Sequence, residues 1–270
     1  MKHRFEEAKK VFIDEVVADE YIELESSTKA YLQLEQSLNK SSKLVLLFGE
    51  PGTGKTMLLS RLYSQLKHQM DLHLIDTPSG TRREFYEKLF YIFTGQRMPS
   101  GSTINLETFV EYAKKVKEDR RVIILLDEAQ MYPTEMLEEV RILSDTGSIK
   151  FVISLHKTVD EDVIARKHFQ SRIWETIELK NADRDELRAY IYKRLIKHNQ
   201  MALADQFKDR HFKLIHRLTK GNFRECNKLL YTTFDIADYY DRHNPKKIPH
   251  NQLPMKIIEM AAIRSGLIDV

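Results

Sequence analysis

Residues 49 to 56 form the stretch of the chain whose residue types and spacing most directly imply chemistry. They read Gly-Glu-Pro-Gly-Thr-Gly-Lys-Thr, which fits the eight-residue phosphate-loop pattern at every defined position. Glycines let the backbone bend so that its N–H groups point at phosphate oxygens, and a helix N-terminus after the loop adds partial positive charge. The loop is therefore predicted to bind the phosphates of a nucleotide.

The residues of this loop have separate predicted roles. Lys55 is expected to reach the β- and γ-phosphates, and the hydroxyl of Thr56 to coordinate Mg²⁺. The predicted cofactor-binding set of the loop is Gly49, Glu50, Pro51, Gly52, Thr53, Gly54, Lys55, Thr56 and Met57.

A second candidate group follows about 70 residues later, as Asp127 and Glu128 come directly after the aliphatic run 122–126. Asp127 is predicted to hold the Mg²⁺ shell. Glu128 is predicted to orient or deprotonate an attacking water. An acidic pair after a strand is common by itself, but its position after an intact phosphate loop favours the second half of a hydrolytic site.

Hydrolysis also needs a polar group that detects the γ-phosphate and positive charge that stabilises it. Ser154 and His156 end a predicted strand where such a sensor is expected, although His156 is equally compatible with an ordinary loop histidine. Arg172 is a candidate arginine finger that enters the site of a neighbouring subunit, with Arg166 as the alternative, and a plain surface role stays open for both. Arg224 is expected to contact bound nucleotide from a C-terminal helix.

The elements that must position these residues alternate along the first two thirds of the chain. The apolar run 44–48 precedes the loop, and a helix is predicted over 57–70 because Leu58, Leu62 and Leu66 share one face. Further strands are predicted at 72–76, 122–126, 151–155 and 173–179, the last at an edge, and further helices at 81–94 and 106–116. This alternation predicts an α/β fold of three layers, a sheet with helices on each side.

From residue 183 onward the pattern is helical only. Asn222 and Glu225 form a capping pair for the longest of these helices. The predicted division is therefore a nucleotide-binding α/β domain over residues 1–181 and a helical lid domain over residues 182–270, and the first 25 residues are expected to pack on the core as a lead-in.

These features together resemble the AAA+ ATPases, and more closely the ExeA/MshM-type ATPases of bacterial type II secretion, pilus and related envelope systems. The segments that carry the likeness are the phosphate loop, Leu125-Leu126-Asp127-Glu128-Ala129-Gln130, Gln170-Ser171-Arg172-Ile173, Tyr190-Ile191-Tyr192-Lys193-Arg194-Leu195 and Gly221-Asn222-Phe223-Arg224-Glu225-Cys226-Asn227. The likeness covers about residues 16 to 240. It implies a P-loop AAA+ fold with five parallel strands in the order 5-1-4-3-2 and a C-terminal lid, ATP as substrate, and the roles given above for Lys55, Thr56, Asp127, Glu128 and Arg224.

Two departures from that family change what is expected of this chain. The family tends to have Gly-Gln where this chain has Ser154-Leu155-His156, which leaves the sensor open. ExeA also looks like the ATPase module followed by a membrane span and a wall-binding domain, whereas this sequence stops at Val270. Recruitment by a membrane-anchored protein partner is therefore expected.

Composition limits the partners and the compartment only mildly. The 43 Lys and Arg residues against 40 Asp and Glu give a formal charge of +3, which permits a nucleic-acid partner without favouring one. The single cysteine, Cys226, fits a reducing compartment and a buried apolar position. No apolar run approaches the length of a membrane span, so a cytoplasmic protein recruited to the inner membrane is expected.

Three functions stay open at this point. The first is an ATPase that assembles or remodels a secretion, pilus or DNA-uptake apparatus and forms a homo-oligomer when it binds ATP. The second is an ATP-dependent DNA-binding regulator of the transposition or origin-recognition type. The third is a nucleotide-gated binding module with little turnover.

Overall fold

The computed structural model describes residues 5–99, 101–102, 105–116, 120–156, 173–249 and 252–268. Its sheet consists of β1 (Leu44–Gly49), β2 (Leu72–Ile75), β3 (Val122–Leu126), β4 (Ile149–His156) and β5 (Glu175–Leu179). Every pairing is parallel and the order is β2-β3-β4-β1-β5. This is the predicted order 5-1-4-3-2 read from the other edge, so the sheet prediction is confirmed, including the edge position of the fifth strand.

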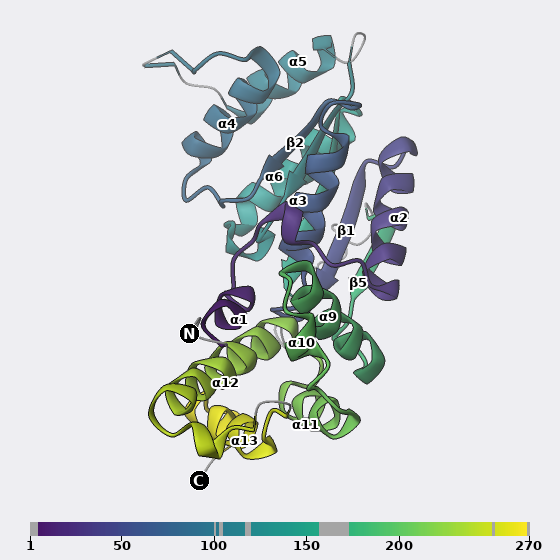
Figure 1. Cartoon of the computed structure of the whole chain (residues 1–270). Helices are drawn as coiled ribbons and strands as arrows, with labels where there is room; N and C mark the ends of the chain where they lie inside the picture. The colour runs from purple at the N-terminus through teal and green to yellow at the C-terminus, as the bar shows by residue number, and fades with distance from the viewer. Residues whose placement is uncertain are drawn as a thin grey trace.

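Helices cover both faces of the sheet, and alternate side chains of each strand enter different cores (Figure 1). Leu44 and Leu46 of β1 pack with α4 (Arg82–Thr94), α5 (Leu106–Val116) and α6 (Thr134–Asp145). Val45 and Leu47 pack with α2 (Glu25–Asn39) and α3 (Lys55–Leu66) on the other face. Burying each such side chain stabilises the fold by about 1.5–3 kcal/mol. The predicted three-layer α/β architecture is confirmed.

Helix α6 was not predicted, because the sequence analysis assigned no element to residues 131–150. A helical period is present in its sequence, because the buried residues recur at helical spacing; they are Met136, Leu137, Val140 and Leu143. The usual start signal was absent, since the residue at the N-cap position is Pro133 and no side chain caps the first turn.

The remaining helices form a separate core below the carboxyl ends of the strands (Figure 1). We call α9 (Arg184–Lys197), α10 (Met201–Ala204), α11 (Asp209–Thr219), α12 (Phe223–His243) and α13 (Met255–Arg264) the lid helices. Cys226 is fully buried in their core, as predicted, and burial raises the pKa of its thiol. Within the described ranges, no helix is both long enough and apolar enough to cross a bilayer.

The N-terminal helix α1 (Glu6–Val11) packs with the lid helices, although its sequence precedes the sheet. The rings of Phe5 and Phe12 lie 6.2 and 5.8 Å from the ring of Phe234 in α12. Residues 1–25 were expected to pack on the core as a lead-in to the α/β domain, whereas Phe5 and the apolar residues of α1 pack in the core of the lid helices. The domain boundary near residue 181 stays a prediction, and the packing of α1 shows that the helical core draws on both ends of the chain.

A close backbone contact joins the segment after β5 to the turn between α11 and α12. The N–H of Ala182 donates to the carbonyl of Gly221 (3.0 Å). Gly221 has a φ of 78°, and a Cβ atom there would lie 1.8 Å from the carbonyl oxygen of Ala182. Only glycine therefore fits this contact, which fixes the turn that carries Asn222 and Arg224.

We predict that Gly221→Ala destabilises the protein by about 2–4 kcal/mol, because it combines left-handed strain with overpacking against a backbone oxygen. Gly95→Ala is the matched control, since Gly95 has a φ of 70° with nothing within 4 Å of its added Cβ. The Gly95→Ala variant should lose only about 1–2 kcal/mol of unfolding free energy, from the left-handed backbone conformation. Chemical denaturation measures both, and equal losses would contradict the contact at Ala182.

Candidate nucleotide-binding site

The phosphate loop bends at two glycines between β1 and α3. Gly52 and Gly54 have φ angles of 82° and 95°, in the region that disfavours any other residue. Gly54 is the N-cap residue of α3, so the N-terminus of that helix opens onto the loop. The hydroxyl of Thr53 donates to the carbonyl of Glu50 (2.9 Å) and closes the turn. The predicted strand, loop and helix are therefore present, with α3 beginning at Lys55 rather than Met57.

Lys55 lies buried across the loop that precedes it. Its side chain donates from Nζ to the carbonyls of Gly49 (2.8 Å) and Glu50 (2.9 Å). Burial lowers the pKa of Lys55 to about 8, and the charges of Glu128 and Asp127 oppose this shift. The Lys55 side chain is thus held at the loop by two backbone carbonyls. A bound anion would raise the pKa of Lys55 again, because it stabilises the protonated amine.

Asp127 and Glu128 follow β3 at the same end of the sheet. Asp127 is 1% exposed, and its Oδ1 is a buried oxygen with no hydrogen-bond partner among the described residues. A buried carboxylate oxygen without a donor suits a cation, and Thr56 lies in the first turn of α3 across the site. The chemistry of these residues therefore fits Mg²⁺, and the assignment of Thr56 and Asp127 as its ligands stays a prediction.

Glu128 is held in an unusual backbone and side-chain arrangement. Its φ is 50°, a left-handed conformation that costs a non-glycine residue about 1–2 kcal/mol. Its Oε2 accepts a hydrogen bond from Nε2 of Gln130 and lies 3.2 Å from Nε2 of His156. The carboxylate is thus bonded to two neighbours on its own end of the sheet.

Gln130 connects Glu128 to His156, and the sequence analysis gave it no role. Its Oε1 accepts from the backbone N–H of His156 (3.2 Å), which turns its Nε2 toward Nδ1 of the imidazole (3.2 Å). With Nδ1 as acceptor, Nε2 of His156 carries the proton that faces Glu128. Burial, followed by the charge of Lys55, lowers the pKa of His156. The signal available in the sequence was the position of Gln130 two residues after Glu128.

The two predicted sensor residues occupy different places. His156 reaches the pocket beside Glu128, whereas Ser154 is buried in the sheet and its Oγ has no partner among the described residues. The roles of both stay predictions. Arg172 and its alternative Arg166 lie outside the described residues.

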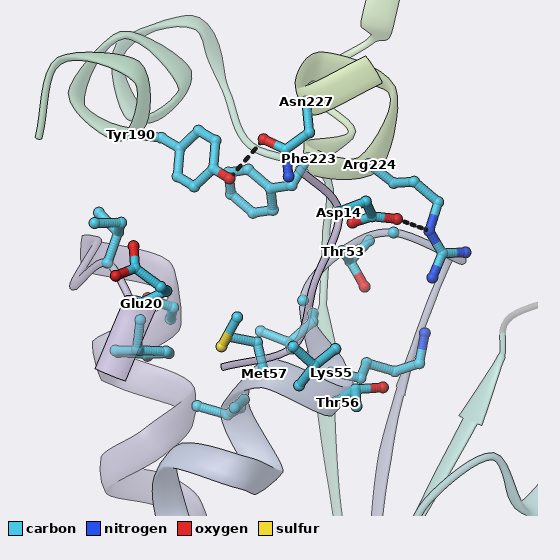
Figure 2. A pocket seen from close by; sticks show the side chains of 18 of the residues that line it. Asp14, Glu20, Thr53, Lys55, Thr56, Met57, Tyr190, Phe223, Arg224 and Asn227 are labelled. Atoms are coloured by element: carbon cyan, nitrogen blue, oxygen red, sulfur yellow. Dashed lines mark hydrogen bonds and ion pairs between the residues drawn. The ribbon is translucent and has the colours of Figure 1, made fainter. Parts of the chain in front are cut away.

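Arg224 lies beside the phosphate loop at the start of α12 and lines the same pocket. Its Nε donates to Oδ2 of Asp14 (3.2 Å), and both side chains are more than half exposed. Figure 2 shows this pair close to Thr53 and Lys55. The pair is weak because it is exposed, so an anion in the pocket can compete with Asp14 for the guanidinium.

The turn before α12 is bonded directly to the phosphate loop. Asn222 donates from Nδ2 to the carbonyl of Pro51 (2.6 Å), and the N–H of Phe223 donates to the carbonyl of Gly52 (3.1 Å). The Oδ1 of Asn222 accepts from the N–H of Glu225 (3.2 Å), so the predicted cap is confirmed. A single side chain therefore caps α12 and holds the loop, a contact that the sequence analysis did not find.

Beyond the phosphate loop the pocket continues between the lid helices and the segment that follows α1 (Figure 2). Its lining there is largely apolar and aromatic and includes Val16, Ile22, Met57, Tyr190 and Phe223. The rings of Tyr190 and Phe223 lie 4.7 Å apart, and the hydroxyl of Tyr190 donates to Oδ1 of Asn227 (2.7 Å). A flat aromatic group with a phosphate tail matches the shape and chemistry of this pocket.

Comparison with known proteins agrees with the fold and the loop. Residues 38–161 match the family described as AAA domain. General secretion pathway protein A of Aeromonas hydrophila is 24% identical over 250 residues, which are 87% of this chain and 44% of that protein. The chain thus spans less than half the length of this relative.

Solved structures share the fold at low sequence identity. The ORC2 protein of Aeropyrum pernix, in its ADPNP–ADP complexes, has a TM-score of 0.62 and 17% identity over 97% of this chain and 72% of that chain. Cdc6p of Pyrobaculum aerophilum has a TM-score of 0.65 and 15% identity over 95% of this chain and 71% of that chain. Residues 38–161 therefore resemble the AAA-domain family, and the chain shares its fold with these solved structures.

The lowered pKa of Lys55 predicts that ATP binds more weakly at high pH. Bound phosphates favour the charged lysine, so above about pH 8 binding must take up a proton and the affinity falls. We expect the dissociation constant to rise roughly 20-fold from about pH 7.5 to about pH 9.5, since a free lysine with a pKa of about 8 loses its proton across that range. Isothermal titration calorimetry measures the affinity at each pH.

The matched variant for this prediction is Lys55→Met, which cannot titrate at this position. It should bind ATP more weakly than the wild-type protein near neutral pH and show a flat pH profile. A wild-type affinity that does not change between the two pH values would contradict the prediction.

Proposed function

We propose that this chain is an ATP hydrolase whose site comprises the phosphate loop, Asp127 and Glu128. The observation that carries the proposal is the convergence at one end of the sheet of buried Lys55, the unpartnered buried oxygen of Asp127, and Glu128. Binding alone needs the first two groups. A carboxylate held beside them is the group that activation of a water requires.

Different residues of the site bind the nucleotide and activate the water. Lys55 and the loop N–H groups bind the β- and γ-phosphates, while Tyr190 and Phe223 enclose the base. Thr56 and Asp127 would hold Mg²⁺, which would supply positive charge to the phosphate oxygens. Glu128 accepts a proton from water as the water oxygen bonds to the γ-phosphorus and the bond to the β-γ bridging oxygen breaks, giving ADP and phosphate.

In this proposal, His156 and Gln130 set how strong a base the carboxylate of Glu128 is. Both donate toward Oε2 of Glu128, and a carboxylate that already accepts two hydrogen bonds is a weaker base for water. Bound γ-phosphate adds negative charge beside Lys55 and attracts the Nε2 proton of His156. We infer that His156 is the γ-phosphate sensor and that Glu128 is freed for catalysis when the imidazole turns to the phosphate. Ser154, buried behind it, would act only by supporting the strand.

The work that hydrolysis performs is inferred from the likeness to General secretion pathway protein A. We propose that ATP binding and hydrolysis assemble or remodel a protein complex of a bacterial secretion, pilus or DNA-uptake apparatus, with recruitment by a membrane-anchored partner. The direct bonds between the phosphate loop and the α12 turn support this use, because a change at the loop must move the lid helices.

We predict that Glu128→Gln lowers the rate of ATP hydrolysis by at least about 100-fold, because the amide cannot accept a proton from water. ATP affinity should stay within about twofold, since the side chain keeps its size and does not bind the phosphates. Phosphate release and calorimetric binding measure the two quantities on the same protein.

Glu135→Gln is the control for this variant, because Glu135 is an exposed acid in the first turn of α6 and does not line the pocket. It should hydrolyse ATP at the wild-type rate. A Glu128→Gln protein with unchanged turnover would refute the catalytic role of Glu128. A wild-type protein that binds ATP without turnover would favour the nucleotide-gated module.

DNA binding is the second candidate, and one observation favours it. The ORC1 protein of Aeropyrum pernix, solved in complex with DNA, matches with a TM-score of 0.64 and 16% identity over 95% of this chain and 69% of that chain. An ATP-dependent DNA-binding regulator should bind duplex DNA at low salt and lose affinity steeply as salt rises. Fluorescence anisotropy with ATP present tests this, and no binding at about 50 mM salt would exclude the candidate.

A further inference from the structure

Arg194 is a buried cation in α9 to which neither the fold nor the proposed reaction gives a role. It is 6% exposed, and within the described residues no carboxylate lies at ion-pair distance from it. A buried guanidinium is expensive to desolvate and needs most of its N–H groups satisfied. The hydrogen-bond acceptors of the Arg194 guanidinium therefore indicate the role of this residue.

Two of these acceptors lie in the chain segment that leaves α1. Arg194 donates from Nε to the carbonyl of Val11 (2.6 Å) and from Nη2 to the carbonyl of Ile13 (3.3 Å). Its guanidinium also lies 5.7 Å from the centre of the Phe12 ring, within the range of a cation–π contact. Three consecutive residues are thus fixed by a single side chain.

Residues 13–24, which we call the strap, continue from this point across the nucleotide pocket to the start of α2. Val16, Tyr21 and Ile22 of the strap line the pocket. Lys193 of α9 and His198, which follows that helix, also contact the strap. Lys193 donates to the carbonyl of Glu23 (2.6 Å), and Nε2 of His198 lies 2.7 Å from a carboxylate oxygen of Glu20.

The third acceptor of Arg194 lies in the opposite wall of the same pocket. Nη1 donates to the hydroxyl of Tyr190, whose ring centre is 5.6 Å from the guanidinium. That hydroxyl in turn donates to Asn227, and the ring packs on Phe223. Figure 2 shows Tyr190, Phe223 and Asn227 together above the loop. Burial raises the pKa of Tyr190 to about 12, so its hydroxyl keeps the proton that Asn227 accepts.

We infer that Arg194 is a positioning residue for the base end of the nucleotide site, because it joins the strap to the Tyr190 wall and sets the width of the slot between them. The inference rests on the proposed nucleotide site and adds a residue that acts on the base without touching the phosphates. Phosphate binding depends on the loop, Lys55 and α3, none of which contacts Arg194 through a hydrogen bond among the described residues.

The test compares two ligands, ATP and inorganic tripolyphosphate, which has the phosphates without the base. In Arg194→Met we expect the dissociation constant of ATP to rise about tenfold or more, mainly through faster dissociation, since several bonds to a charged group are lost. The affinity for tripolyphosphate should stay within about twofold. Calorimetry gives the constants, and stopped-flow release of a fluorescent ATP analogue gives the dissociation rate.

Two further variants separate this role from general support of the fold. Arg188→Met removes an exposed arginine of the same helix that stacks on Phe212 (5.6 Å) and does not line the pocket. It should bind both ligands as the wild-type protein does. Tyr190→Phe removes only the hydroxyl that Arg194 and Asn227 share, and it should weaken ATP binding by about threefold to tenfold while tripolyphosphate binding is unchanged.

Specific outcomes overturn the inference. Arg194→Met that binds ATP with the wild-type affinity and dissociation rate refutes it. Equal losses of ATP and tripolyphosphate also refute it, because Arg194 would then support the whole fold. A wild-type protein that binds neither ligand refutes the nucleotide site itself, which distinguishes failure of the proposed function from failure of this inference.

Discussion

The close approach of the α12 turn to the phosphate loop is the contact on which the rest of the site depends. Asn222 and Phe223 bond to the carbonyls of Pro51 and Gly52, and a Cβ atom on Gly52 would lie 2.3 Å from Oδ1 of Asn222. The glycine is therefore needed twice, for the bend that presents N–H groups to phosphate and for the space that admits the turn. Because the turn begins α12, the phosphate loop and the lid helices cannot move independently.

The charged groups of the site differ in whether they have partners within the protein. Lys55 and Asp127 are almost fully buried and each lacks a close partner of opposite charge among the described ion pairs, so the site holds charges whose natural complements are a phosphate and a cation. Glu128 is treated differently, since Gln130 and His156 engage its carboxylate. Lys55 and Asp127 thus lack a side-chain partner of opposite charge among the described ion pairs, whereas the carboxylate of Glu128 has two partners.

The N-terminal segment connects parts of the molecule that the sheet does not. Helix α1 is built into the core of the lid helices, the strap crosses the pocket, and Arg61 of α3 lies 5.8 Å from the ring of Tyr21 in the strap. A ligand that fills the slot beside the strap would contact α3, the strap and the lid helices together.

The strands and the loop could be predicted from the sequence alone, because apolar runs, glycine positions and a complete phosphate motif are local signals, whereas the strand order came from the family resemblance. The sequence also assigned Lys55, Asp127 and Glu128 to one nucleotide site, with His156 as a candidate sensor. It did not predict α6, which lacks a capping side chain, the contact of Asn222 with the phosphate loop, or the contacts of Gln130, Arg194 and Asp14. Those contacts join residues up to 210 positions apart, such as Asp14 with Arg224, and depend on which of two cores receives α1. Only tertiary packing decides such contacts, because no local pattern records which distant carbonyl or carboxylate a side chain will meet.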